Sequence, residues 1–289
     1  MQYDPVTYGP QYIIGGITIN GSTDSTGCDW VLTSETGWFG APAIKTARVD
    51  KPAARGTFRG NEYRGARVIV LQCTLSAPTV AALRAAEYRV LGICPNPQLQ
   101  YPLTVVDETG LSLYANVVLD GEILITPITW NSATVSIQLV APDPRKFSTN
   151  PTVVSVLLAS AGTGGVTYPV AYPVSYGTPG LPGAIVLTNT GTADSDPTVT
   201  LTGPLTNPSL IRADTGDTVS YNGTLLSTDR LVINFGAGSV MLDGVNRRSL
   251  LSALNWFTIP GTSSITMLFR TTNTADTGSM SVSYGNTSY

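Results

Sequence analysis

Histidine is absent from the 289-residue chain. Without an imidazole, the chain cannot build a Ser-His-Asp or Cys-His nucleophile pair or an HExxH zinc site. Only three cysteines occur, Cys28, Cys73 and Cys94, and no two of them form a CxxC pair. An odd number of widely spaced cysteines disfavours both structural zinc and a disulfide framework. We therefore expect three free thiols, no bound metal, no cofactor and no enzymatic activity.

Charged residues are also scarce, at 12% of the chain, against about 25% in typical globular domains. Hydrophobic residues make up 42%, and glycine and proline are abundant, with 29 and 20 copies. This balance is typical of a folded protein rich in strands and turns rather than of a helical bundle or a disordered chain. No stretch has the pattern of a signal peptide, and no apolar run approaches the ~18–20 residues of a membrane span. We therefore expect a protein that assembles in the cytoplasm.

The first half of the chain predicts strands and one helix. The helix is predicted at residues 79–91, where Pro78 favours a helix start and Gly92 and Pro95 favour its end. Short apolar or alternating runs bounded by turn residues indicate the strands. These runs are residues 12–14, 17–19, 63–75, 103–107, 112–119 and 133–140.

The composition changes after residues 141–145 (APDPR), because the following residues 151–289 contain no lysine and are crowded with Thr, Ser, Gly and Asn. We predict a first domain at 1–150, a second at 151–289, and a boundary segment at about 142–183, rich in Gly, Pro and Tyr. The regular spacing of short strands in the second half is typical of a β-sandwich. The predicted strands are residues 184–188, 198–202, 209–212, 218–221, 230–234, 240–242, 265–269 and 280–284.

Several strings, taken in order along the chain, are shared with a known family. In the first half they are residues 60–71 (GNEYRGARVIVL), 102–105 (PLTV) and 138–147 (QLVAPDPRKF). In the second half they are residues 187–203 (LTNTGTADSDPTVTLTG), 207–209 (NPS), 242–248 (LDGVNRR), Trp256 and 259–261 (IPG). With these strings, the chain resembles the distal tail proteins of long non-contractile-tailed phages, a family also described as siphovirus tail components or minor tail proteins.

The resemblance implies a mainly β fold: a tail-tube-like N-terminal β-sandwich with one helix, and a C-terminal β-sandwich like those of galectins or carbohydrate-binding modules. It implies a structural virion protein at the phage tail tip, in which the first domain closes into a six-fold homo-oligomeric ring. The implied partners are the tail tube protein, tail-tip proteins and receptor-binding proteins, with DNA passing only transiently. The alternative is an adhesion module that binds a host surface glycan. The sequence identifies no long inserted arm that would serve as a dock for receptor-binding proteins.

A basic stretch stands out from this nearly neutral chain. Between residues 45 and 67 the local net charge is +5, so that the remainder of the chain carries −8. The stretch is either a solvated loop and strand edge or a surface at a ring interface or channel lumen. We favour the interface over the lumen, because a channel through which DNA slides gains nothing from tight binding. The candidate residues are Lys45, Arg48, Lys51, Arg55, Arg59, Arg64 and Arg67.

Two further residue classes are weaker candidates. The Asp pairs at 194 and 196 and at 214 and 217 could bind a hard cation, but Asp beside Gly is ordinary turn chemistry. Aromatic side chains could stack on a sugar, although core packing is the default for a tryptophan in a strand-rich domain. Among them Trp256 is the candidate sugar-binding residue, with core packing favoured. The other aromatic residues considered are Trp30, Trp38, Trp130, Tyr168, Tyr172 and Tyr176.

Overall fold

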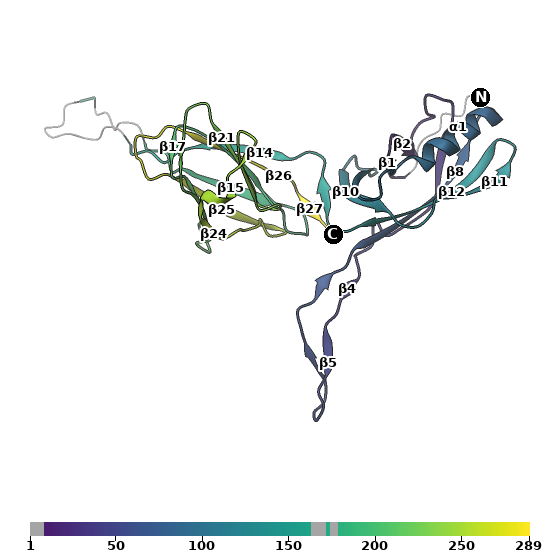
Figure 1. The fold of residues 1–289 in the computed structure, drawn as a ribbon, viewed down its shortest axis with the longest axis horizontal. Coiled ribbons are helices and arrows are strands. Elements are labelled where there is room, and N and C mark those ends of the chain that lie inside the picture. The colour runs from purple at the N-terminus through teal and green to yellow at the C-terminus, as the bar shows by residue number, and fades with distance from the viewer. Residues whose placement is uncertain (1–8, 163–171, 174–178) are drawn as a thin grey trace. The chain divides into compact units, whose positions relative to one another are not determined.

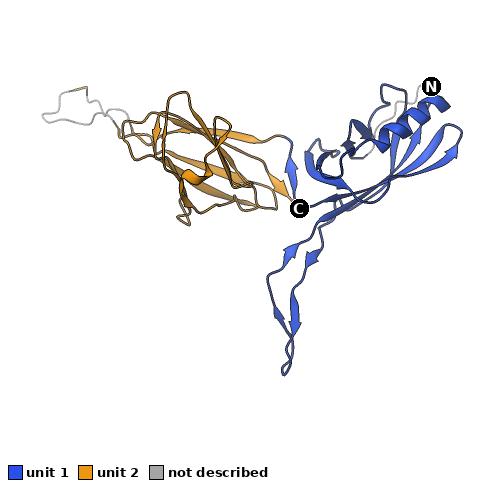
Figure 2. Cartoon of the chain, viewed as in Figure 1, with its two compact units in different colours: residues 1–149, 289 blue, residues 150–288 orange. Residues whose placement is uncertain are grey.

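The computed structural model describes residues 9–162, 172–173 and 179–289. The chain divides into two compact units, residues 1–149 with Tyr289 and residues 150–288 (Figure 2). Strands dominate both units, and one α-helix is present in the described residues (Figure 1). The predicted mainly β fold with a single helix in the first half is therefore confirmed.

The first unit is built on a sheet with the strand order β2-β1-β9-β10-β12-β8-β3, with β11 paired to β12 and β13 to β10. Its elements outside the arm described below are β1 (Gln11–Ile14), β2 (Ile17–Ile19), β3 (Asp29–Thr36), β8 (Arg67–Ser76), α1 (Val80–Leu91), β9 (Tyr101–Val106), β10 (Ser112–Leu119), β11 (Leu124–Thr129), β12 (Ser132–Ala141) and β13 (Lys146–Ser148).

Buried and more exposed residues alternate along two long central strands, and the buried ones form the core of the first unit. In both β8 and β12 every second residue is buried, and the strands pair antiparallel along their whole length, from Ser132 opposite Ser76 to Ala141 opposite Arg67. The buried side chains include Ile69, Leu71 and those of one face of α1. The other face of β8 and β12 is partly exposed and carries no charged side chain, since its residues are Val, Thr, Ser and Gln.

The helix begins one residue later than predicted. Thr79 is the N-cap, and its hydroxyl accepts a hydrogen bond from the backbone N–H of Ala82 at 3.1 Å. Pro78 therefore precedes the cap instead of occupying the first helical turn. At the other end, the backbone N–H of Gly92 bonds to the carbonyls of the last turn, so the predicted stop is confirmed.

A long two-stranded ribbon projects from the sheet between β3 and β8 (Figure 1). We call residues 43–65 the arm. Its strands are β4 (Ile44–Lys45), β5 (Arg48–Asp50), β6 (Thr57–Arg59) and β7 (Tyr63–Arg64). The sequence analysis identified no inserted arm, and it predicted one strand at residues 63–75. The structure shows that residues 43–65 form an arm, without assigning it to receptor-binding proteins, and it corrects the predicted strand, which is interrupted at Gly65, whose N–H donates to the carbonyl of Ala43 at the base of the arm.

The second unit is a β-sandwich of two antiparallel sheets, with orders β14-β26-β16-β21-β22-β23 and β15-β25-β18-β19-β24, plus the short pair β17-β20. Its elements are β14 (Thr152–Leu157), β15 (Ala184–Asn189), β16 (Thr198–Thr202), β17 (Leu205–Thr206), β18 (Ser209–Arg212), β19 (Thr218–Tyr221), β20 (Thr224–Leu225), β21 (Arg230–Asn234), β22 (Ser239–Leu242), β23 (Val245–Asn246), η1 (Arg248–Leu250), β24 (Leu251–Leu254), β25 (Ser263–Arg270), β26 (Ser279–Tyr284) and β27 (Thr287–Ser288).

Apolar side chains from both sheets fill the space between them, among them Leu201, Met267, Phe269 and Val282. The outward side chains of the adjacent strands β16 and β26 are all Thr or Ser. This inward and outward division follows the two-residue period of a strand. All eight strands predicted in this half are present.

Part of the predicted boundary segment at 142–183 lies outside the described residues, including Tyr168 and Tyr176. Among the described residues, no helix is long and apolar enough to cross a membrane.

We predict that the two units are separable by protease. Few residues connect β13, which ends at Ser148, to β14, which starts at Thr152. A linker between two independent cores is the usual site of cleavage. Limited proteolysis should cut first between residues 142 and 183 and leave two fragments that resist further digestion, as read by intact mass. Early cleavage scattered through both halves would contradict this prediction.

Candidate interaction site: the basic arm

Backbone pairing makes the arm an antiparallel ribbon from base to tip. Ile44 lies opposite Arg64 near the base, and Val49 lies opposite Phe58 farther out. The N–H of Gly60 donates to the carbonyl of Ala47 at 2.8 Å and links the two short strand pairs. At about 3.3 Å per residue, the ribbon extends roughly 30 Å beyond the sheet.

Six of the seven candidate basic residues belong to the arm. Glu62 neutralises part of this charge, because its two oxygens accept hydrogen bonds from Arg48 at 3.2 Å and Arg59 at 2.6 Å. The hydrogen bond from Arg59 is the main reason that the pKa of Glu62 lies below its ordinary value. Lys45 and Arg55 have no ion pair within the described residues. The arm therefore keeps an excess of positive charge available to a partner.

The arm also exposes apolar and aromatic side chains. Val49, Phe58 and Tyr63 are 69%, 60% and 67% exposed. Val49 and Phe58 are directly opposite and so share one face of the ribbon, while the neighbouring opposite pair, Arg48 and Arg59, lies on the other face. Lys51 lies over the Phe58 ring, with Nζ 5.5 Å from its centroid. The sequence analysis missed these apolar residues, although aromatic residues interleaved with a basic run were the available signal.

Arg67 differs from the other six basic residues, because it is 1% exposed and lies at the base of the arm. Its guanidinium donates to four backbone carbonyls. The acceptors are Gly37, Trp38 and Gly40, at 2.5, 3.0 and 2.6 Å from Nη1, and Pro144, at 3.0 Å from Nε. Arg67 is therefore a structural anchor that ties the chain leading into the arm to the end of β12, and it is not available to a ring partner or to DNA.

A glycine permits the close approach on which this anchor depends. Gly37 has φ +99°, and a Cβ at this position would lie 1.8 Å from the carbonyl oxygen of Val68. A side chain at position 37 would thus displace either β8 or the chain entering the arm.

A second cation, Lys146, is buried beside Arg67. Its Nζ donates to the carbonyl of Trp38 at 3.2 Å and lies 5.5 Å from the centroid of the Trp38 ring. Burial, together with the positive charge of Arg67, lowers the pKa of Lys146 to about 8, and Glu35 opposes this shift. The base of the arm thus contains two buried cations held mainly by backbone carbonyls.

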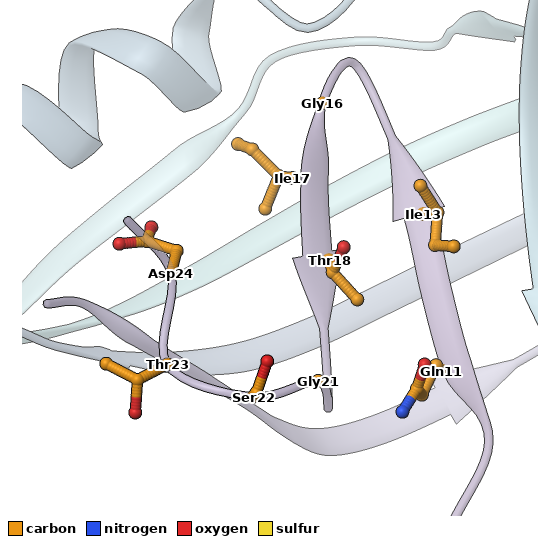
Figure 3. A pocket seen from close by; sticks show the side chains of 9 residues that line it. All are labelled: Gln11, Ile13, Gly16, Ile17, Thr18, Gly21, Ser22, Thr23 and Asp24. Carbon is orange, nitrogen blue, oxygen red and sulfur yellow. The ribbon is translucent and has the colours of Figure 1, made fainter. Parts of the chain in front are cut away.

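A pocket of about 450 Å³ lies beside the β1–β2 hairpin and the loop that follows it (Figure 3). Asp24 is its one charged lining residue. Its carboxylate accepts hydrogen bonds from the backbone N–H groups of Thr26 and Cys28, the indole of Trp30 and the guanidinium of Arg89. Although burial opposes the change, hydrogen bonds from Thr26 and Arg89 hold the pKa of Asp24 well below its ordinary range. Asp24 is therefore committed to the structure, and the residues lining the pocket include no second ionisable group with which it could form an acid–base pair.

The other candidate residues have structural roles or no site around them. Trp256 is partly buried and packs edge-on against Phe235, with ring centroids 5.3 Å apart, so it belongs to the edge of the core. Asp214 pairs with Arg212, and Asp217 accepts from Thr215 within the same turn. Within the described residues no group of three or more acidic or cysteine side chains could hold a metal ion.

The remaining aromatic candidates are divided between core and surface. Trp30 and Trp38 are buried in the first unit, as expected for core residues, and the three cysteines are buried and unpaired. Trp130 is an exception to the expectation of core packing, because it is 67% exposed at the turn between β11 and β12. Tyr172 is also exposed.

We predict that Lys146 makes stability rise with pH. The unfolded chain binds this proton up to pH 10.5 and the folded chain only to about 8, so unfolding takes up a proton between these values and is disfavoured as pH rises. The free energy of unfolding in urea should be measured for the wild type and for Lys146→Met at pH 7.5 and 9.5. Between these pH values it should rise more in the wild type than in the variant, by at most ~1.4 kcal/mol per pH unit.

Cys73 has the opposite effect on the pH dependence of stability, and this effect cancels when the wild type is compared with Lys146→Met. Burial raises the pKa of that thiol to about 12, which costs stability at high pH in both proteins alike. Equal pH slopes for the two proteins would show that Lys146 does not titrate in this range.

Comparison with known proteins supports the resemblance seen in the sequence. Residues 190–287 match the family model of the siphovirus-type tail component, C-terminal domain. No curated protein sequence matches the chain. The crystal structure of SPP1 Dit (gp 19.1) superimposes with a TM-score of 0.65 at 11% identity and covers 96% of this chain and 98% of its own. A chain from the phage P2 baseplate in its activated conformation with Ca superimposes with a TM-score of 0.50 at 10% identity, covering 94% and 97%.

At these identities the two structures establish similarity of fold, and the family match covers most of the second unit. The fold similarity extends over both units. The chain is thus similar to the siphovirus-type tail components in its C-terminal sequence and to SPP1 Dit in its fold, and its resemblance to the phage distal tail proteins is confirmed.

Proposed function

We propose that the chain is a structural virion protein that forms the hub at the distal end of a long non-contractile phage tail. In this role it joins the tail tube to the tail tip and the host-recognition proteins, and it performs no catalysis. The matched SPP1 protein is described as a paradigm of the hub adsorption apparatus in phages that infect Gram-positive bacteria. The protein would assemble in the host cytoplasm and then reside in the virion.

The exposed arm is the observation that carries this proposal. A ribbon of two strands is marginally stable alone in water, and exposed aromatic side chains beside basic ones are typical of a protein interface. A contact between unlike patches of identical subunits closes into a ring when its rotation closes. We assign the ring, six-fold as in the family resemblance, to a first domain at residues 1–150 that uses the arm as part of its subunit contact.

The second domain, residues 151–289, would then lie outside the subunit contacts of the ring. It has no lysine, and it exposes Ser and Thr along β16 and β26, which suits a surface in contact with solvent. The basic side chains reside on the arm rather than on the uncharged face of β8 and β12, and this favours a subunit contact over a DNA-binding lumen. Passage of DNA would remain transient and non-specific.

We predict that reversing the charge of the arm slows ring assembly. Interface charges affect association rate and register more than final affinity, so Arg55→Glu, Arg59→Glu and Arg64→Glu together should slow association about tenfold at low salt. Light scattering on the full chain measures the mass and its growth with time. The wild-type association rate should itself fall as salt rises.

A matched control carries the same charge change in the second unit: Arg230→Glu, Arg247→Glu and Arg248→Glu. These exposed arginines lie outside the arm, so the control should associate like the wild type. Residues 1–150 alone should oligomerise and residues 151–289 should not. Oligomerisation of the second fragment alone, with a monomeric first fragment, would refute the assignment.

A further inference from the structure

At its base the arm contacts its own unit through Arg64, whose Cζ lies 4.2 Å from the centroid of the Tyr289 ring, but Val49, Phe58 and Tyr63 remain exposed. It leaves the sheet at the end of β8 where Arg67 pairs with Ala141, and it projects away from the sheet (Figure 1). Its exposed Val49, Phe58 and Tyr63 must therefore be covered by another molecule if they are covered at all.

A complementary surface lies along β11, which pairs with β12 on the side away from β8 and ends near Ser132, at the end of the strand pair farthest from the arm. Here β11 forms an edge of the sheet, because β12 is its one partner among the described strands. Leu124 and Ile128 on β11, and Trp130 in the turn that follows it, are exposed apolar residues. An exposed tryptophan beside an open strand edge is a strong candidate for an interface anchor.

This surface is also acidic, in contrast to the arm. Asp120 and Glu122 lie in the loop that leads into β11, at the end of this strand away from Trp130, and both are exposed. Asp120 accepts a hydrogen bond from Gln138 at 2.7 Å, and neither carboxylate forms an ion pair within the described residues. We call residues 120–130 the β11 edge.

We propose that the arm of one copy docks on the β11 edge of a second copy, with Trp130 and Phe58 in the apolar contact and Asp120 and Glu122 facing the arm cations. The proposal rests on the proposed ring and names the receiving surface within it. The arm presents cations and exposed apolar side chains, and the β11 edge presents carboxylates and exposed apolar side chains. The apolar side chains of both surfaces are exposed to solvent in the single chain. Because the arm leaves the sheet from β8 while the β11 edge lies on the other side of β12, each copy can give one contact and receive one, which is the requirement for a head-to-tail series.

The exposed face of α1 is the alternative docking surface for the arm. Tyr88 and Leu91 on α1 are exposed and apolar, but the charges beside them are compensated, since Arg84 pairs with Glu87 and Arg89 with Asp24. Of these two surfaces, only the β11 edge combines exposed apolar side chains with carboxylates that form no ion pair within the described residues, and it is therefore the better match for a cationic arm.

Disulfide trapping between copies tests the proposal. Full-length Phe58→Cys is mixed with full-length Trp130→Cys under mild oxidation, and covalent dimers are quantified on non-reducing gels. The native cysteines are buried and should not react. The control mixture pairs Phe58→Cys with Tyr88→Cys, which places an exposed thiol on α1 instead. We expect at least tenfold more dimer in the first mixture, and equal yields or a reversed order would overturn the proposal.

A charge exchange supplies a second test that does not need an introduced thiol. Arg55→Glu and Glu122→Arg should each weaken self-association, measured by light scattering, and the two combined in one chain should recover at least part of it. A combined variant weaker than either single variant would overturn the pairing of these surfaces. If the wild type assembles while both tests fail, the proposed ring stands and the docking surface is wrong. A wild type that stays monomeric overturns both.

Discussion

A ribbon of two strands cannot bury its own apolar face, and this constraint governs the interpretation of the whole chain. The arm carries Val49, Phe58 and Tyr63 into solvent together with six basic side chains. At least one further strand, or a helix packed against it, is needed before such a ribbon gains a core. The first unit anchors the base of the arm through the Arg67 guanidinium and the contact of Arg64 with Tyr289, and it leaves the apolar side chains of the arm exposed. The arm is therefore understood as half of an interface whose other half belongs to another molecule.

The elements that the sequence predicted well are those whose burial alternates. In β16 and β19 apolar and polar residues alternate, and β18 and β21 are short apolar runs bounded by polar residues, so the predicted bounds of all four agree with the structure. The helix was recognisable from its spacing and its stop at Gly92. The arm lacked such a signal, because a ribbon exposed on both faces has no pattern of burial. Likewise, the sequence does not distinguish Arg67 from the other cations of the basic stretch. Its structural role is evident only from the fold, which places four backbone carbonyls around its guanidinium.

The two units differ in how charged their surfaces are, and this difference bears on the proposed function. The first unit concentrates charge of both signs at separate places, basic on the arm and acidic at the β11 edge, which favours contact between identical copies in one orientation. The second unit is a self-contained sandwich with a polar surface and the family's C-terminal sequence features. The proposed hub would use the first unit for contacts between copies and leave the second unit for other contacts.

Hydrogen exchange in the arm tests the central claim most directly. Peptides covering residues 44–64 are followed by mass spectrometry in the full chain, at high protein concentration and after dilution to the monomer. The account predicts slow exchange of arm amides in the assembled protein and fast exchange after dilution, with core peptides of β8 and β12 unchanged. An assembled protein whose arm amides exchange as fast as those of the monomer would contradict it, because the arm would then be outside the interface.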